Sequence, residues 1–187
     1  MMEERDYAGC CGLCCGLCPR FQSTAASRCL GCQLGEQHNY CSAWRCCVTK
    51  HGFHTCAECA EFPCERLLKV IGVGVDSFIS HRPALPNLER IRQAGLPCYL
   101  DEQRERRLLL EDLLAHYNEG RSMSFYCAAC ALMPVHLVRQ ALGEMDSLVS
   151  SGQVPDADVR AKAKAMRSLL QELARQAGVD LTLRKGP

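Results

Sequence analysis

The sequence has few of the features that would place it in a membrane or on a charged partner. No stretch approaches the roughly 20 consecutive apolar residues that a membrane-spanning helix needs. The N-terminus has no apolar run of the kind found in a secretory signal. The formal net charge is +1, which gives no global attraction to nucleic acid or to an anionic surface. We therefore expect a cytoplasmic protein without membrane association.

Aromatic and aliphatic residues are also scarce where the cysteines are concentrated. Thirteen of the sixteen cysteines lie between Cys10 and Cys64, and this segment holds few large apolar side chains. Hydrophobic burial within the segment is too small to stabilise it alone. In a reducing cytoplasm, cysteines at this density indicate metal or redox chemistry. A secreted disulfide scaffold is the alternative, although the recurring C-x2-C pairs are more typical of metal sites.

Three cysteine pairs have the C-x2-C spacing of metal-binding knuckles: Cys15 and Cys18, Cys29 and Cys32, and Cys56 and Cys59. Ten residues separate the first two pairs, a spacing close to that of four-thiolate zinc sites. Cys11 extends the first pair to a C-x3-C-x2-C triplet, which suits three corners of an iron–sulfur cluster. The same triplet occurs in radical S-adenosylmethionine enzymes, but their barrel needs more strands than this sequence predicts.

We expect two four-thiolate sites, for which the sequence offers ten candidate ligands in two groups. The first group is Cys15, Cys18, Cys29 and Cys32, with Cys11 competing, and the second is Cys41, Cys47, Cys56 and Cys59, with Cys64 competing. Order and spacing leave open which neighbour in each Cys-Cys doublet is the ligand. They also leave open whether the metal is zinc or a [4Fe-4S] cluster. His51 and His54 are further candidate ligands.

Four ordered motifs carry a family resemblance. They are Cys-Gly-Leu-x-Cys-x-x-Cys-Pro from Cys11, Cys-x-Gly-Cys from Cys29, Cys-Ala-Glu-Cys-x-x-x-Pro-Cys-Glu from Cys56, and Gly-Arg-Ser-x-Ser-Phe-x-Cys from Gly120. With these motifs, residues 10–145 resemble an uncharacterised cysteine-rich family, domain-of-unknown-function family 3795. The resemblance implies a metal-binding domain and no established activity. Five cysteines lie outside the family pattern: Cys10, Cys14, Cys46, Cys98 and Cys130.

After Cys64 the apolar residues recur at helical spacing. We expect helices at 65–71, at 88–94 between an Asn87 cap and a Gly95 stop, at 102–118 after an Asp101 cap, at 122–133, from Pro134 onward, and at 156–177 after an Asp156 cap. The expected fold is mainly α with small irregular β. It comprises a cysteine-rich metal-binding lobe at 10–66, a helical lobe packed on it at 67–150, and a C-terminal amphipathic helix and tail at 151–187.

The segment around Arg121 is a second candidate site. Ser122 has the position of an N-cap, and a helix start beside an arginine favours an anion. A capped turn with an arginine salt bridge is the simpler interpretation. Cys127 and Cys130 share a helical face. Three interpretations are open: a fourth knuckle, a redox pair, or two small side chains buried in the core.

Three functions fit these patterns. We favour a binding or adaptor protein with structural zinc, because each knuckle has the C-x2-C form of zinc ribbons. A small iron–sulfur protein in electron transfer is the alternative, because the cysteines exceed what two zinc ions need. A thiol enzyme using Cys127 is a minor alternative, so we lean against an enzyme. Residues 1–64 hold five Lys/Arg and six Asp/Glu, which favours a protein partner over nucleic acid.

Overall fold

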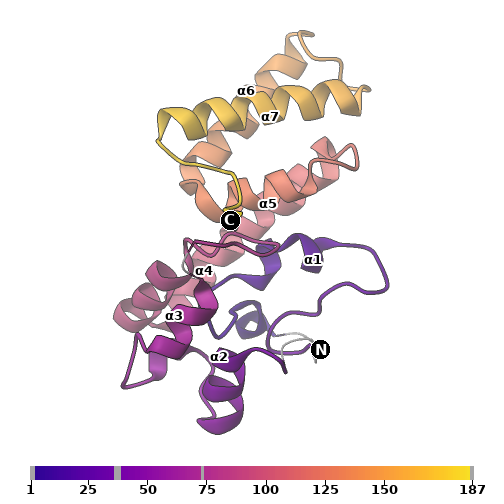
Figure 1. Cartoon of the computed structure of the whole chain (residues 1–187). Helices are drawn as coiled ribbons and strands as arrows, with labels where there is room; N and C mark the ends of the chain where they lie inside the picture. The colour runs from indigo at the N-terminus through magenta and orange to yellow at the C-terminus, as the bar shows by residue number, and fades with distance from the viewer. Residues whose placement is uncertain (1–2, 36–38, 73, 186–187) are drawn as a thin grey trace. The chain divides into compact units, whose positions relative to one another are not determined.

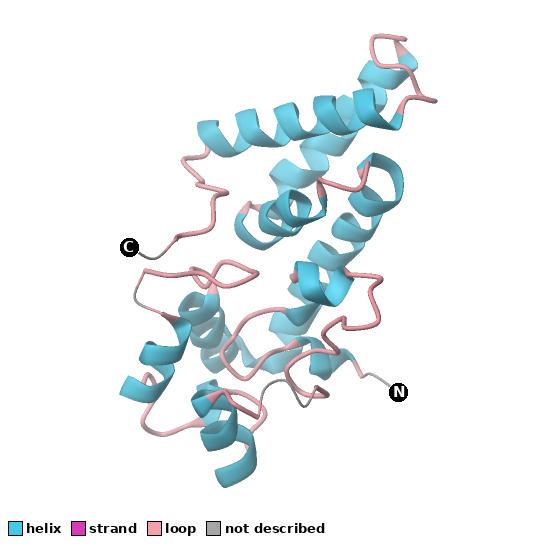
Figure 2. Ribbon diagram, turned by 45° about the vertical axis from the view of Figure 1, so that its right-hand side comes forward, coloured by secondary structure: helices cyan, strands magenta, loops and turns pink. Residues whose placement is uncertain are grey.

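The computed structural model describes residues 3–35, 39–72 and 74–185 and divides the chain into two compact units (Figure 1). The first unit comprises Met1–Arg104 and Leu183–Pro187, and the second comprises Glu105–Thr182. Both are helical, and Figure 2 draws the described residues as helices and loops. One isolated β-bridge among them joins Ala8 and Cys14. The predicted fold class, mainly α with little β, is confirmed. The predicted division into segments 10–66, 67–150 and 151–187 has boundaries that differ from those of the two units. That division stays a prediction.

The first unit consists of short elements joined by cysteine-rich turns. In chain order they are η1 (Glu4–Tyr7), η2 (Cys15–Leu17), α1 (Pro19–Gln22), α2 (Ser42–Trp44), η4 (Arg45–Lys50), η5 (Cys56–Glu58), α3 (Glu65–Ile71) and the first part of α4 (Ala84–Tyr117). Of these, α3 coincides with the helix predicted at 65–71. The helices before it are brief because glycines and knuckles interrupt the sequence every few residues.

The cysteine segment packs on apolar residues that lie outside it. Leu67 of α3 and four residues of α4 are buried against Cys10, Cys11, Cys47 and Cys56; the α4 residues are Leu88, Ile91, Tyr99 and Leu100. Each fully buried side chain of this size contributes roughly 1.5–3 kcal/mol. The cysteine-rich segment therefore does belong to a hydrophobic core. Part of that core is supplied by residues after Cys64, which a count within residues 10–64 does not include.

Helix α4 shows where the predicted caps are wrong. Gly95 has non-helical dihedral angles (φ 85°, ψ 158°) and interrupts α4, as predicted, but the helix resumes at once and Asp101 caps nothing. Pro97 is tolerated because it falls in the first turn after the interruption. Asn87 is not a cap either, since α4 begins at Ala84. Its side-chain amide instead donates a hydrogen bond to the Gly12 carbonyl, at 2.8 Å.

The second unit contains the last part of α4 together with α5 (Met123–Leu132), α6 (Val135–Ser150) and α7 (Val159–Gln176). Helix α7 packs along α6 (Figures 1 and 2). Their apolar faces are buried: Val138, Ala141 and Met145 of α6, and Ala163, Met166, Leu170 and Leu173 of α7. Within the described residues, no helix is both long enough and apolar enough to span a bilayer.

The predicted Asp156 cap of α7 is wrong by two residues. Asp158 is the cap, and its carboxylate accepts hydrogen bonds from the backbone N–H groups of Arg160 and Ala161. Asp156 pairs with Lys162, at 2.9 Å. Two aspartates at this spacing both satisfy the sequence rule for a helix start, so the sequence alone does not choose between them.

Candidate metal centres

Two of the C-x2-C pairs adopt the same local turn. In η2 the Cys18 N–H donates to the Cys15 carbonyl at 3.0 Å, and in η5 the Cys59 N–H donates to the Cys56 carbonyl at 3.2 Å. A 3₁₀ turn places side chains i and i+3 on one side of the backbone. Each pair therefore presents both of its thiols in one direction, which is the arrangement a shared ligand requires.

Gly12 anchors the loop that carries the first of these pairs. Its φ is +85°, and a Cβ at this position would lie 2.3 Å from the Ala84 carbonyl oxygen. The Gly12 carbonyl accepts hydrogen bonds from the Asn87 amide at 2.8 Å and from the Tyr99 hydroxyl at 3.2 Å. Glycine is required here because the loop must both turn with positive φ and lie directly against α4.

Seven cysteines line one cavity of about 330 Å³ in the first unit: Cys11, Cys14, Cys15, Cys18, Cys29, Cys32 and Cys41. All five residues of the first predicted group are among them. Cys41 lies here too, although the sequence placed it in the second group. Phe21, Phe78 and Ile79 are among the residues that complete the lining. The structure thus brings together residues from three separate turns of the chain.

Hydrogen bonds to sulfur and burial shift the pKa values of the thiols around this first cavity. Backbone N–H groups donate to sulfur at two positions, Cys32 to Cys15 Sγ at 3.3 Å and Gly31 to Cys29 Sγ at 3.4 Å. The Cys32 thiol also donates to Cys15, which lowers the pKa of Cys15 and raises that of Cys32. Burial raises the pKa of Cys11 to about 12. These donors favour a thiolate at Cys15.

The loop at Gly9 holds two of these thiols close together. A Cβ built on Gly9 would lie 3.6 Å from Cys32 Sγ and 3.7 Å from Cys11 Sγ. Both sulfur atoms therefore approach the same point on the backbone.

Five further cysteines line a second, narrower cavity: Cys46, Cys47, Cys56, Cys59 and Cys64. Its volume is about 20 Å³, which is room for one small ion or one water. Three of the five, with His51, also line a surface hollow of about 780 Å³. His51 stacks on Phe53, with ring centroids 5.5 Å apart. His54, the other histidine candidate, has its Nε2 2.7 Å from the Arg5 carbonyl oxygen.

Cys10 joins this second group although it lies outside the family pattern. The thiols of Cys10 and Cys56 donate hydrogen bonds to Cys47, which lowers the pKa of Cys47 to about 5. The same contacts raise the pKa of Cys10. The Cys56 backbone N–H also donates to the Cys10 carbonyl, at 2.9 Å. The sequence placed Cys10, Cys14 and Cys46 outside the family pattern but left open which neighbour in each Cys-Cys doublet is a ligand.

The donor set fits a thiophilic metal in kind and in number. All sixteen cysteines are free thiols, and thiolates are the preferred ligands of zinc and of iron–sulfur clusters. Within the described ranges, no three His, Cys, Asp or Glu side chains are arranged to hold a metal ion as they stand. Thiols instead hydrogen-bond to one another within two groups, Cys15 with Cys32, and Cys10 with Cys47 and Cys56. A metal would replace those protons, so its binding would be coupled to proton release.

The residues around Arg121 lie in the second unit. Ser122 precedes α5 as predicted, but its hydroxyl donates to Glu119 Oε1 at 2.9 Å and caps no helix N–H. Cys127 and Cys130 are each 1% exposed, and burial raises the pKa of Cys130 to about 12. A reactive thiol needs exposure and a lowered pKa, so their burial fits the third interpretation, that of small apolar side chains.

Comparisons of the chain with protein-family models, with curated proteins and with solved structures gave no match. The resemblance to family 3795 rests on the four motifs and stays a prediction. Inference about function therefore rests on how the thiols are arranged.

Proposed function

We propose that the first unit is a binding or adaptor domain stabilised by zinc at two thiolate centres. The observation that carries this proposal is that both knuckles of the first predicted group line a single cavity. Two facing knuckles supply the four thiolates of a closed tetrahedral zinc site. Backbone N–H groups donate to Cys15 and Cys29, one in each knuckle, and such bonds hold the sulfurs of a metal site in place.

The second centre is assigned to the narrower cavity. Cys47, Cys56, Cys59 and Cys64 line it, and its volume of about 20 Å³ suits one ion more than a cluster. Cys10 donates a hydrogen bond to Cys47 and either supports this centre or takes a place in it.

Metal at these positions would contribute directly to folding. Cys10, Cys11, Cys47 and Cys56 are buried in the core of the first unit, so a metal on neighbouring thiols would tie that core together. Structural zinc in small domains supplies roughly 10–16 kcal/mol of binding free energy, which becomes folding free energy when no site exists in the unfolded chain. The short elements of the first unit are consistent with such dependence.

An iron–sulfur protein is the second candidate, and the first cavity gives a specific reason. Seven cysteines surround it, three more than one zinc ion takes, and the triplet Cys11, Cys15 and Cys18 is among them. Sulfurs that line a cavity without meeting at one point suit the larger body of a [4Fe-4S] cluster. The function in that case is electron transfer or service to a redox enzyme.

Location and partner follow from the same chemistry. Sixteen free thiols are maintained in a reducing compartment, which supports a cytoplasmic location. Leu30 and Leu34 are each 48% exposed and Tyr40 is 90% exposed, all in the loop that connects Cys29 to Cys41. Exposed apolar side chains concentrated in one loop favour a protein partner over nucleic acid.

The test is metal analysis of the chain purified without oxygen, together with its visible spectrum. About two zinc ions per chain and no visible absorption support the zinc centres. Iron with matching sulfide and a colour that fades on reduction supports the cluster and refutes the zinc assignment. A folded first unit with neither metal refutes both. Cys29→Ser should remove one centre, whereas Cys98→Ser, which changes a cysteine that lines neither cavity, should retain both.

A further inference from the structure

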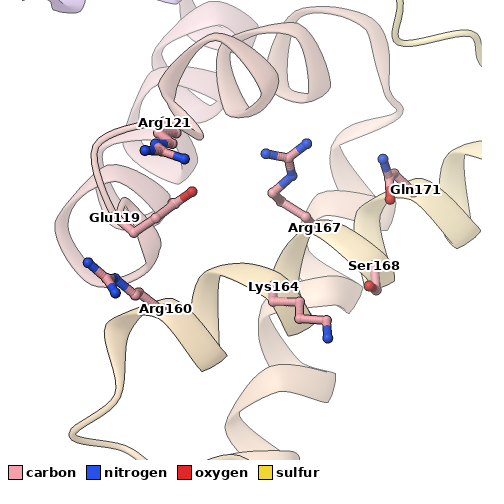
Figure 3. Close-up of a pocket in the computed structure, with 7 residues that line it drawn as sticks. All are labelled: Glu119, Arg121, Arg160, Lys164, Arg167, Ser168 and Gln171. Carbon is pink, nitrogen blue, oxygen red and sulfur yellow. The ribbon is translucent and has the colours of Figure 1, made fainter.

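A chemically different cavity lies within the second unit. Its volume is about 640 Å³, and every residue that lines it carries a polar or charged group: Glu119, Arg121, Arg160, Lys164, Arg167, Ser168 and Gln171 (Figure 3). Glu119 and Arg121 belong to the turn before α5, and the other five side chains lie along α7. The cavity is therefore bounded by two segments that are distant in sequence.

The periodicity of α7 explains why its basic residues gather here. Arg160, Lys164 and Arg167 occur at i, i+4 and i+7, so they share one face of the helix. The adjacent face, which includes Met166 and Leu170, is buried against the rest of the unit. Burial of that face fixes the rotation of α7 and leaves the three cations where they line the cavity.

The four cations of this cavity outnumber its single carboxylate. The structure shows no ion pair for Arg121, Arg160, Lys164 or Arg167 with any residue it describes. Other cations of the unit do have carboxylate partners: Lys162 pairs with Asp156 and Arg175 with Glu172. Four like charges around one volume repel one another unless an anion enters.

Glu119 is the one carboxylate in the lining, and only one of its two oxygen atoms accepts a hydrogen bond. Its Oε1 accepts the Ser122 hydroxyl at 2.9 Å. Its Oε2 is buried without a hydrogen-bond partner in the described part of the chain. A buried acceptor of this kind is costly unless a donor reaches it, and a hydroxyl group of a ligand is such a donor.

We propose that this cavity binds a small molecule that carries a chain of two or three phosphates. Phosphate chains bear three to four negative charges, which matches four cations less one carboxylate. Arginine binds phosphate oxygens with paired N–H donors. The volume falls in the range of roughly 300–1,000 Å³ typical of small-molecule sites. A nucleic-acid backbone would need a longer row of basic residues than this cavity offers, which is one arginine in the turn and three basic residues on α7.

The test is calorimetric titration of the full chain, as purified, with ATP, inorganic triphosphate, AMP and orthophosphate. Both triphosphates should bind, and orthophosphate should bind at least about tenfold more weakly, because it reaches fewer cations. ATP tighter than inorganic triphosphate identifies a nucleotide, and equal affinity identifies the phosphate chain alone as the recognised group.

Exposed side chains provide the variants. Arg121→Gln and Lys164→Gln should each weaken triphosphate binding about tenfold or more. The matched control is Arg175→Gln, which removes the same charge from α7 outside the cavity and should leave the affinity unchanged. Arg167 is less suitable, because its guanidinium lies 5.1 Å from the Phe125 ring centroid and its loss could also loosen the unit.

Four results would overturn the proposal. The first is no triphosphate binding by the wild-type chain. The second is equal weakening by Arg175→Gln, which would mean non-specific attraction. The third is undiminished heat with Arg121→Gln and Lys164→Gln combined, which would mean that the heat arises outside this cavity. Preferential binding of single-stranded RNA with a steep salt dependence would likewise replace a small ligand with a nucleic-acid track.

Discussion

Replacement of Gly12 by alanine tests how the cysteine loop is held on α4. Gly12 has φ +85°, and an added Cβ would lie 2.3 Å from the Ala84 carbonyl oxygen and 2.7 Å from Leu88 Cγ. Neither a backbone carbonyl nor a buried leucine can move away without shifting α4. The loop must therefore retreat, and its carbonyl then loses the bonds from Asn87 and Tyr99.

The cost has two parts. Positive φ in an L-residue costs roughly 1–2 kcal/mol, and overpacking at a well-packed contact costs about 1–3 kcal/mol. Gly12→Ala should therefore destabilise the first unit by about 2–5 kcal/mol. This is a large share of a typical stability of about 5–15 kcal/mol.

Gly52→Ala is the matched control. Gly52 also has positive φ, +67°, but a Cβ there meets no atom within 4 Å, so only the backbone term applies. Urea unfolding can be followed by the fluorescence of Trp44, the sole tryptophan, which packs against the first core. Gly12→Ala should lose at least about 1 kcal/mol more than Gly52→Ala. Equal losses would refute the close approach of the loop to α4.

Two further predictions follow from buried polar groups and thiols. Burial acts to raise the pKa of Asp76, but hydrogen bonds from Arg184 outweigh it and hold that pKa well below its ordinary range. The unfolded chain then binds the proton more readily, so the stability from Asp76 is full above about pH 4 and falls as the pH drops further. Asp76→Asn should cost about 1.5–3 kcal/mol at neutral pH and flatten the acid limb of the stability profile measured in urea; an unchanged limb would contradict this. Cys127 and Cys130 should resist a maleimide in the native chain, because each is 1% exposed, while the partly exposed Cys98 reacts. Rapid native labelling of Cys127 in a mass-spectrometric time course would revive the thiol-enzyme hypothesis.

Much of the helical structure could be predicted because the signals are local. The bounds of α3 were predicted to the residue, and the break at Gly95 follows from one positive-φ glycine. The errors also have local causes. Asp101 and Asp156 each satisfy the composition of a cap, but the chain is already helical at Asp101, and Asp158, two residues after Asp156, caps α7.

The knuckles were predictable and their assembly was not. Spacing indicates that Cys15 and Cys18 act together, because a single turn joins them. Spacing does not determine that Cys41 lines the same cavity, because that depends on how loops meet in space. The pairing of Asp76 with Arg184, 108 residues apart, has no local signal at all.

The cavity lined by Arg121 and α7 could be predicted in part. Arg121 was a candidate because it precedes a helix, and the shared face of Arg160, Lys164 and Arg167 follows from helical periodicity. Their common cavity requires knowledge of how α7 packs in its unit. The sequence therefore predicts Arg121 and the basic face of α7 separately, but it does not predict that they line one cavity.

X-ray absorption at the metal edge tests the thiolate centres most directly. The measurement is made on the full chain purified without oxygen, whichever metal it carries, and it reports the atoms bound to that metal. Thiolate centres predict a first shell of about four sulfur atoms near 2.3 Å when the metal is zinc. A first shell of nitrogen and oxygen, or a folded chain without bound metal, would contradict the account.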